Sequence, residues 1–392
     1  MFKTINSLRA LFFAAFLLFI ANSYLLNSNA IILKELGFND FQIGIVATCI
    51  YFGAFVSTIL SPLIVQKVGH IRSFGFFSAI FAIAILLHIN AKQLYIFCLL
   101  RFCLGYCYYA LLVVIESWIN NRAKNENRSR ILAVYEIVFY SGFCLGALFL
   151  YFKLNQANVF VLAAIIMLFC SIPLNLLKIK QPKIHIKEKI KIPDVFAISK
   201  LAFIAALIGG FLMNGFYSMS QSYFLALGYG IKDISIFVFS AMLGGFIAQL
   251  YVGKLSDIYG RKLALLTCST LAFVASLALL FFAKTFLIYF LCFCLGMGLF
   301  CIYVLALARA SDRVNESAAI LEVGRTLLFT YSVSAIFAPI IMGALISKFG
   351  PNSFIILYII LLGILSLFTL TQPKIEAKKR VEFENTFKVL SE

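Results

Sequence analysis

About twelve apolar segments follow one another along this chain, and no other feature limits its possible folds so strongly. Each is roughly 18–25 residues long, which is enough for an α-helix to cross the hydrocarbon core of a bilayer. Their centres lie near residues 19, 54, 82, 106, 141, 167, 213, 243, 273, 297, 332 and 361. Hydrophobic residues make up 63% of the chain and charged residues 12%, whereas soluble domains are about a quarter charged. We therefore predict an all-α membrane protein with twelve transmembrane helices.

The second half of the chain repeats the first half at an offset of 191 residues. This offset aligns three pairs of strings: Leu36–Phe38 with Leu227–Tyr229, Gly69 with Gly260, and Phe102–Gly105 with Phe293–Gly296. Three matches at one offset predict two copies of a six-helix unit, and parallel repeats around a central cavity are typical of transporters. We expect four parts: an N-terminal six-helix bundle over residues 1–177, a basic cytoplasmic linker over 178–199, a C-terminal six-helix bundle over 200–371 and a cytoplasmic tail over 372–392.

Lys and Arg residues are concentrated in every second loop. If the N-terminus is cytoplasmic, 25 of the 33 lie in cytoplasmic segments and six in the opposite loops, while Arg101 and Arg325 lie inside helices. By the positive-inside rule, this bias predicts a multi-pass protein of a bacterial inner membrane with both termini in the cytoplasm. Because the net charge of +17 is spread over loops, it favours membrane lipids as partners and disfavours nucleic acid.

A short polar string separates two apolar segments in the second half: Gly253-Lys254-Leu255-Ser256-Asp257-Ile258-Tyr259-Gly260-Arg261-Lys262. It resembles the loop signature GxxxDxxGR[RK] of the major facilitator superfamily. Four other strings resemble the YcaD-type branch of that superfamily: Glu116–Asn120, Arg128–Arg130, Tyr140–Gly142 and Asn214–Tyr217. The resemblance covers the whole chain and implies the major facilitator fold, in which two six-helix bundles rock about a central site. It also implies secondary active transport of a small molecule, with protons as the expected coupling ion.

In the family, the Asp and Arg of this loop clamp the two halves together on the cytoplasmic side. The resemblance therefore implies a cytoplasmic gate that consists of Gly253, Asp257, Gly260 and Arg261. The first-half copy of the loop has Gln66 and His70 in place of this Asp and this Arg. Glu116, at the inner end of the fourth segment, could supply a second latch because three basic residues lie within loop range, namely Arg72, Arg122 and Arg128.

Charged residues inside a membrane are costly, so each one indicates a function by default. Arg101 lies eight residues into the fourth segment counted from Gln93, roughly 12 Å deep at about 1.5 Å per residue, which is close to the midplane. Together with Gly105 it resembles the family's RxxxG motif, which implies a role in substrate or proton coupling. The alternative is an arginine that only braces helices. Its partner could be a substrate anion, Glu136 or backbone carbonyl groups.

Other polar residues within the apolar segments are predicted to line the transport pathway. Glu136 lies about two turns inside the fifth segment, and Arg325 lies on the matching part of the eleventh; either could line the inner cavity or close it. Glu136 could carry a proton or stay locked to an arginine. The first segments of the two halves contribute Asn22, Asn27, Asn214, Tyr217 and Gln221. Amides in hydrocarbon need partners or a wet cavity, so both pathway lining and interhelical hydrogen bonding are open for them.

Several classes of function are disfavoured. The sequence has no GxxxxGK[ST] loop for binding phosphate, which excludes ATP as the driving force. The cysteines lie in apolar segments and the three histidines are scattered, so we expect no metal, no cofactor and no enzymatic activity.

Within the transporter class, the direction of transport has two candidates. Gly142 and Gly146 in the fifth segment are followed by Ala147, which leaves the antiporter signature GxxxGP incomplete. The resemblance implies proton coupling, and the apolar and aromatic wall favours efflux of a drug or metabolite. We also expect the transporter to be a monomer. Proton-coupled uptake of a small organic solute is the alternative, and a non-transporting membrane receptor is a more remote one.

Overall fold

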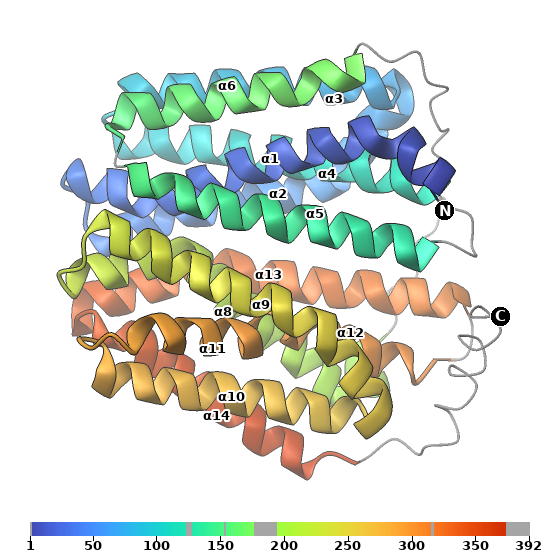
Figure 1. The fold of residues 1–392 in the computed structure, drawn as a ribbon, viewed down its shortest axis with the longest axis vertical. Coiled ribbons are helices and arrows are strands. Elements are labelled where there is room, and N and C mark those ends of the chain that lie inside the picture. Colours follow the sequence, from blue (N-terminus) through green and yellow to red (C-terminus); the bar gives the residue numbers. More distant parts are fainter. Residues whose placement is uncertain (1, 123–127, 153, 176–193, 315–316, 374–392) are drawn as a thin grey trace. The chain divides into compact units, whose positions relative to one another are not determined.

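The computed structural model describes residues 2–122, 128–152, 154–175, 194–314 and 317–373, and every secondary-structure element within these ranges is a helix (Figure 1). The first half contains α1 (Phe2–Glu35), α2 (Asp40–Val68), α3 (His70–Leu87), α4 (Leu94–Arg122), α5 (Arg128–Leu148) and α6 (Gln156–Asn175), with the 3₁₀ helices η1 (His88–Asn90) and η3 (Phe149–Phe152). The second half contains α7 (Val195–Ile198), α8 (Lys200–Ala226), α9 (Ile231–Tyr259), α10 (Arg261–Phe282), α11 (Ile288–Leu299), α12 (Ile302–Ser311), α13 (Ser317–Phe349) and α14 (Asn352–Thr371).

The predicted number of membrane-spanning helices is confirmed for the described part of the chain. Twelve helical segments there are long and apolar enough to cross a membrane. The third of them combines α3 with η1, the fifth combines most of α5 with η3, and the tenth combines α11 with α12. Helix α7 has four residues and is not one of the twelve.

The tenth segment differs from the single helix expected there. The structure divides it into α11 and α12 at Phe300 and Cys301. Gln249 of α9 donates a hydrogen bond from Nε2 to the carbonyl oxygen of Phe300 at 3.4 Å. A side chain that satisfies a carbonyl group beside a break makes the interruption tolerable within a membrane. The apolar length of a segment does not reveal such a break.

The chain divides into two compact units. Unit 1 comprises Met1–Glu188, Tyr217–Phe239 and Pro339–Pro351, and unit 2 comprises Lys189–Phe216, Ser240–Ala338 and Asn352–Glu392. The boundaries therefore cut α8, α9 and α13. The four-part division expected from the sequence follows chain order and stays a prediction. Most of its linker and tail lies outside the described residues, which cover only 194–199 and 372–373 of them.

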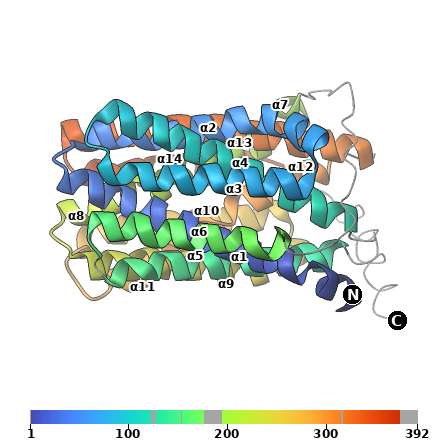
Figure 2. The ribbon, with the colours of Figure 1, turned by 90° about the horizontal axis from the view of Figure 1, so that it is seen from above.

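Within unit 1, the helices of the first half pack around α1 and α4. Helix α1 packs against α5 and α6, and α4 packs against α2 and α3. Helices α3 and α6 also lie side by side, as both views show (Figures 1 and 2). Within unit 2, α10 packs against α11, α12 and α14. The hydroxyl group of Tyr358 on α14 donates a hydrogen bond to the carbonyl oxygen of Leu212 on α8 at 2.6 Å.

The 191-residue repeat of the sequence recurs as a repeat of backbone contacts. In unit 1, a Cβ atom added at Gly53 would strike the carbonyl group of Phe102, and one added at Gly105 would strike that of Ile50. In unit 2 the same clashes recur 191 residues later, between Gly244 and Phe293 and between Gly296 and Ala241. Helices α2 and α4, and likewise α9 and α11, therefore approach each other through glycines that leave room for the neighbouring backbone.

Candidate functional site

Unit 1 holds part of the second half of the chain against first-half helices. Its segment Tyr217–Phe239 contains the last turns of α8 and the first turns of α9. Gln221 on α8 donates from Nε2 to Asn27 Oδ1 on α1 at 2.6 Å. Asn27 in turn donates from Nδ2 to the carbonyl oxygen of Ser23 at 2.7 Å. Both amide side chains are completely buried, so two residues predicted for the pathway are bonded directly to each other.

Further contacts join this part of the second half to α2 and α5. The hydroxyl groups of Tyr51 on α2 and Ser218 on α8 lie 3.1 Å apart. Ser235 on α9 donates a hydrogen bond to the carbonyl oxygen of Ala147 on α5 at 2.9 Å. All of these polar groups lie in helices that cross the apolar zone, where an unpaired group is costly. The contacts therefore fix where α8 and α9 sit within unit 1.

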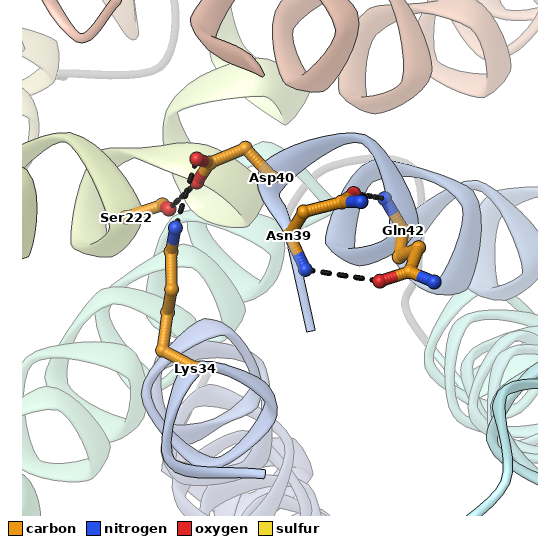
Figure 3. Close-up of polar contacts among 5 residues, drawn as sticks. All are labelled: Lys34, Asn39, Asp40, Gln42 and Ser222. Atoms are coloured by element: carbon orange, nitrogen blue, oxygen red, sulfur yellow. Dashed lines mark hydrogen bonds and ion pairs between the residues drawn. The ribbon is translucent and has the colours of Figure 1, made fainter. Parts of the chain in front are cut away.

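Asp40, the first residue of α2, connects α1, α2 and α8 (Figure 3). Its Oδ2 atom forms an ion pair with Lys34 Nζ at 2.8 Å, and its Oδ1 atom accepts a hydrogen bond from the Ser222 hydroxyl group. Asn39 Oδ1 accepts from the backbone N–H of Gln42 at 2.9 Å, while Gln42 Oε1 accepts from the backbone N–H of Asn39 at 3.0 Å. This capping box fixes the start of α2 and so holds the Asp40 carboxylate between its two partners.

Backbone contact between α2 and α13 accompanies these polar contacts. A Cβ atom added at Gly44 would strike the carbonyl group of Pro339, and one added at Gly343 would strike that of Asp40. Both glycines therefore allow the two helices to meet without an intervening side chain.

We call the three polar contacts, Asn27–Gln221, Tyr51–Ser218 and Lys34–Asp40–Ser222, the α8 seal.

Arg101 is almost completely enclosed, with 1% of its surface exposed. Its Nη1 atom donates a long hydrogen bond of 3.4 Å to the carbonyl oxygen of Leu25 on α1. The Nε and Nη2 atoms have no hydrogen-bond partner among the described residues. None of the ion pairs found in the described ranges includes Arg101. Of the partners expected from the sequence, the structure therefore shows a backbone carbonyl group.

Glu116 of α4 and Glu136 of α5 lie near each other in unit 1. Both side chains are exposed, and their carboxylates interact electrostatically. The Tyr135 hydroxyl group donates a hydrogen bond to Glu116 Oε1 at 3.4 Å. Neither carboxylate belongs to an ion pair in the part of the chain that the structure describes. The expected latch between Glu116 and an arginine stays a prediction, since the Arg128 side chain lies outside the described part.

Two further residues predicted for the pathway contact aromatic side chains of unit 1. The side chain of Asn22 lies near the Tyr108 hydroxyl group of α4. The ring of Tyr217 lies 5.7 Å from that of Phe143, and Phe143 lies 4.4 Å from Phe139 on the same helix. The polar groups expected on the pathway are thus interleaved with an aromatic wall.

In unit 2, the predicted gate motif forms an ion-pair network where α9 meets α10. Arg261 pairs with Asp257 through Nη1 at 2.5 Å and with Asp312 through Nε at 3.1 Å. It also donates a hydrogen bond to the Ser256 hydroxyl group. Gly260 adopts a φ of 94° between the two helices, a conformation that favours glycine because it has no Cβ atom. The motif therefore ties α9, α10 and the end of α12 together.

The other predicted residues of unit 2 lie apart from this network. Gly253 and Arg325 are exposed, and Asn214 Nδ2 bonds to a carbonyl oxygen of its own helix at 2.8 Å. Arg309 is one of the 25 basic residues that the charge count assigns to cytoplasmic segments, but it belongs to α12 and has 1% of its surface exposed. Its Nη2 atom donates a hydrogen bond to the carbonyl oxygen of Pro373 at 2.9 Å.

Sequence reasoning did not find several members of these networks, including Lys34, Asp40, Tyr51, Ser218, Ser222 and Asp312. A signal existed for one of them: Asn39 followed three residues later by Gln42 is a capping-box pattern, which predicts a helix start at Asp40. Lys34 lies six residues before its partner Asp40, across the short connection from α1 to α2. For the remaining residues the partner lies on a distant helix, so the sequence around each one contains no indication of the contact.

Residues 11–327 match the sequence profile described as Major Facilitator Superfamily. The chain belongs to this superfamily. It is 24% identical over 332 residues to an uncharacterized MFS-type transporter of Yersinia enterocolitica, a match that covers 82% of this chain and 84% of the relative. It is also 24% identical over 321 residues to the uncharacterized MFS-type transporter YcaD of Escherichia coli, covering 80% and 82%. The resemblance to the YcaD-type branch is therefore confirmed.

Solved structures with the same fold are transporters of this superfamily's architecture. The nucleoside transporter NupG superimposes with a TM-score of 0.73 at 16% identity, covering 92% of this chain and 97% of the other. A bacterial homolog of the human lysosomal transporter Spinster, in an inward-facing and unoccupied conformation, gives 0.74 at 13% identity, covering 97% and 98%. The likeness shows the major facilitator fold. This MFS protein is a multi-pass secondary transporter of a small molecule.

Proposed function

We propose that this MFS transporter couples the inward movement of protons to the export of a drug or metabolite. The observation that carries the proposal is the pair of exposed carboxylates, Glu116 and Glu136, on two predicted membrane-spanning helices. A carboxylate facing lipid would be costly, so this exposed surface is expected to be wet. Two carboxyl groups that interact with each other cannot both hold their charge easily, which favours proton exchange at the pair.

The proposed pathway residues divide into polar and aromatic parts. We propose that the transport pathway is lined by Asn22, Asn27, Arg101, Glu136, Asn214, Tyr217, Gln221 and Arg325. The aromatic rings beside Tyr217 give the pathway an apolar surface. Export is favoured over uptake for this reason.

Alternating access requires one gate at each end of the pathway. We assign the α8 seal to the outer gate, because it joins the last turns of α8 to α1 and α2 through few hydrogen bonds and one ion pair. We assign Glu116, Gly253, Asp257, Gly260 and Arg261 to the cytoplasmic gate. A free-energy difference of a few kcal/mol is enough to shift the equilibrium between the open and closed states of a gate. The proposal places the protein as a monomer in a bacterial inner membrane with both termini in the cytoplasm.

Proton-coupled uptake of a small organic solute is the second candidate. It is favoured by Ala147, which follows Gly146 where the antiporter signature has proline. In the structure, Gly146 packs against Ser23 and Ile20 of α1, so α5 uses this glycine for helix contact. The direction of proton movement distinguishes the two candidates.

The test uses the purified protein in proteoliposomes that contain a fluorescent pH indicator. A panel of drugs and metabolites is presented on one side, and solute-dependent proton movement is recorded. Export coupled to protons predicts that an outward solute gradient drives protons inward, whereas uptake predicts that solute and protons move in the same direction. Solute movement without any proton flux would contradict the coupling.

Two isosteric variants test the carboxylate pair. Glu116→Gln and Glu136→Gln should each abolish solute-driven proton flux, because an amide cannot exchange the proton. Glu35→Gln removes an exposed carboxyl group at the end of α1 and is the matched control. Normal proton coupling in both variants would show that the proton is carried elsewhere.

A further inference from the structure

Arg101 presents one complete edge of its guanidinium group without a partner. The Nη1 atom is bound to the Leu25 carbonyl oxygen, whereas Nε and Nη2 have no partner among the described residues. Nε and Nη2 lie on the same edge of the planar group, where their N–H bonds are parallel. This edge matches the two oxygen atoms of a carboxylate, and the bidentate pair is among the stronger hydrogen-bonded contacts in proteins.

His88 supplies an acceptor next to the turn of α4 that precedes Arg101. The residue is completely buried at the junction of α3 and η1, and its Nδ1 atom donates to the carbonyl oxygen of Ala84 at 2.7 Å. The neutral ring therefore presents Nε2 as an acceptor, and Nε2 has no partner in the described part of the chain. His88 lies within electrostatic range of Arg101. It also packs 5.4 Å from Phe97, which lies one turn before Arg101 on α4.

Asn29 supplies a second acceptor. It lies one turn after Leu25 on the same face of α1, and side chains of a helix lean toward its N-terminus. The Asn29 amide group therefore leans toward the Leu25 carbonyl group that Arg101 contacts. Asn29 is 3% exposed, and its Oδ1 atom has no partner among the described residues.

The charge of Arg101 has no neutralising carboxylate in the described part of unit 1. Asp40 is paired with Lys34, and Glu116 and Glu136 lie beside each other. An enclosed guanidinium group with no counter-charge destabilises the fold. Water could satisfy its N–H groups but would leave the charge unbalanced. An anion would accept hydrogen bonds from these N–H groups and would also balance the charge.

We propose that Arg101, His88 and Asn29 form a binding site for a small hydroxycarboxylate. The carboxylate group pairs with Nε and Nη2 of Arg101, and the neighbouring hydroxyl group donates to His88 Nε2 or Asn29 Oδ1. This assignment uses the donor edge and the two acceptors together. The near-complete burial of all three side chains limits the ligand to a few heavy atoms. The inference rests on the proposed transport function and narrows its substrate to a small acidic metabolite.

Three ligands of nearly equal size test the recognition chemistry on the full-length protein in detergent. Glycolate has both groups, acetate lacks the hydroxyl group, and glycolamide lacks the charge. Isothermal titration should show saturable binding of glycolate, binding of acetate weaker by roughly tenfold or more, and no binding of glycolamide. Absence of glycolate binding in the wild-type protein would overturn the site and leave Arg101 solvated by dipoles and water.

Variants locate the binding. Arg101→Lys keeps the charge but loses the planar edge, so glycolate binding should weaken by roughly tenfold or more. Asn29→Ala and His88→Phe remove the acceptors, so at least one of them should lose the preference for glycolate over acetate. Arg9→Lys, at an exposed arginine of α1, is the matched control and should bind like the wild type. Unchanged binding in all three site variants would place the ligand elsewhere.

The binding measurement is independent of the transport assay. Glycolate binding without any proton-coupled solute flux would support this site but contradict the proposed function. Proton-coupled flux of other solutes without glycolate binding would support the function and contradict this substrate class.

Discussion

At the scale of single residues, Asp40 and Asp257 show how surroundings decide what a carboxylate contributes. The side chain of Asp257 is 54% exposed and pairs with Arg261 one turn away, so its ion pair is worth little by itself. Asp40 is 14% exposed and joins Lys34 of α1 to Ser222 of α8. Because its partners come from two helices, Asp40 contributes to the relative position of those helices rather than to one helix alone.

Asp40→Asn should therefore loosen the α8 seal. The amide keeps an acceptor for Ser222 but loses the charge that attracts Lys34. Amide hydrogen exchange in the first turn of α2 and the last turn of α8 should become about fivefold faster, which corresponds to roughly 1 kcal/mol. Asp233→Asn, at the start of α9, is the control and should leave exchange in these turns unchanged. Equal exchange in wild type and Asp40→Asn would remove Asp40 from the proposed gate.

The sequence indicated some of these residues and not others, for a physical reason. Asn27 and Gln221 stand out because an amide in an apolar segment needs a partner, and the structure pairs them. Asp40 lies at a helix end, where polar residues are ordinary. Its contact with Ser222 joins it to another helix, and the sequence near Asp40 does not specify this contact.

At the scale of helices, the repeated glycine contacts explain why the two halves of the sequence resemble each other at a fixed offset. A fixed offset of glycines reflects a fixed pair of helix crossings, α2 with α4 and α9 with α11. Apolar length predicts that a helix spans the membrane but not whether it is continuous, because both halves of a broken helix remain apolar. The division of the tenth segment at Phe300 therefore became visible only with its Gln249 contact.

Gly105→Ala should destabilise the crossing of α2 and α4. The added methyl group meets the Ile50 carbonyl group, and forcing extra atoms into a packed contact costs about 1–3 kcal/mol. Thermal unfolding in detergent should show a lower midpoint for this variant. Gly253→Ala, whose new atom meets no heavy atom within 4 Å, should unfold like the wild type. Equal midpoints for both variants would mean that the crossing can relax without cost.

At the scale of the whole molecule, the orientation in the membrane depends on charge, since the two ends of the helices are equally apolar. The bias of 25 basic residues against six in alternate loops predicts which end faces the cytoplasm. The proposed cytoplasmic and outer gates follow from that prediction.

Epitope tags inserted into the intact transporter test the orientation. A tag at residue 185 or after residue 380 should be reached by antibody only after the membrane is opened, because both lie in basic segments. A tag at residue 232, in the first turn of α9 next to the short connection from α8, should be reached from outside in sealed cells. Labelling of all three tags from the same side would contradict the prediction that successive helices cross the membrane in alternating directions. Reversed labelling would exchange the two proposed gates. The Asp40 contacts would then close the cytoplasmic side, and an exporter would have to break them to admit its solute.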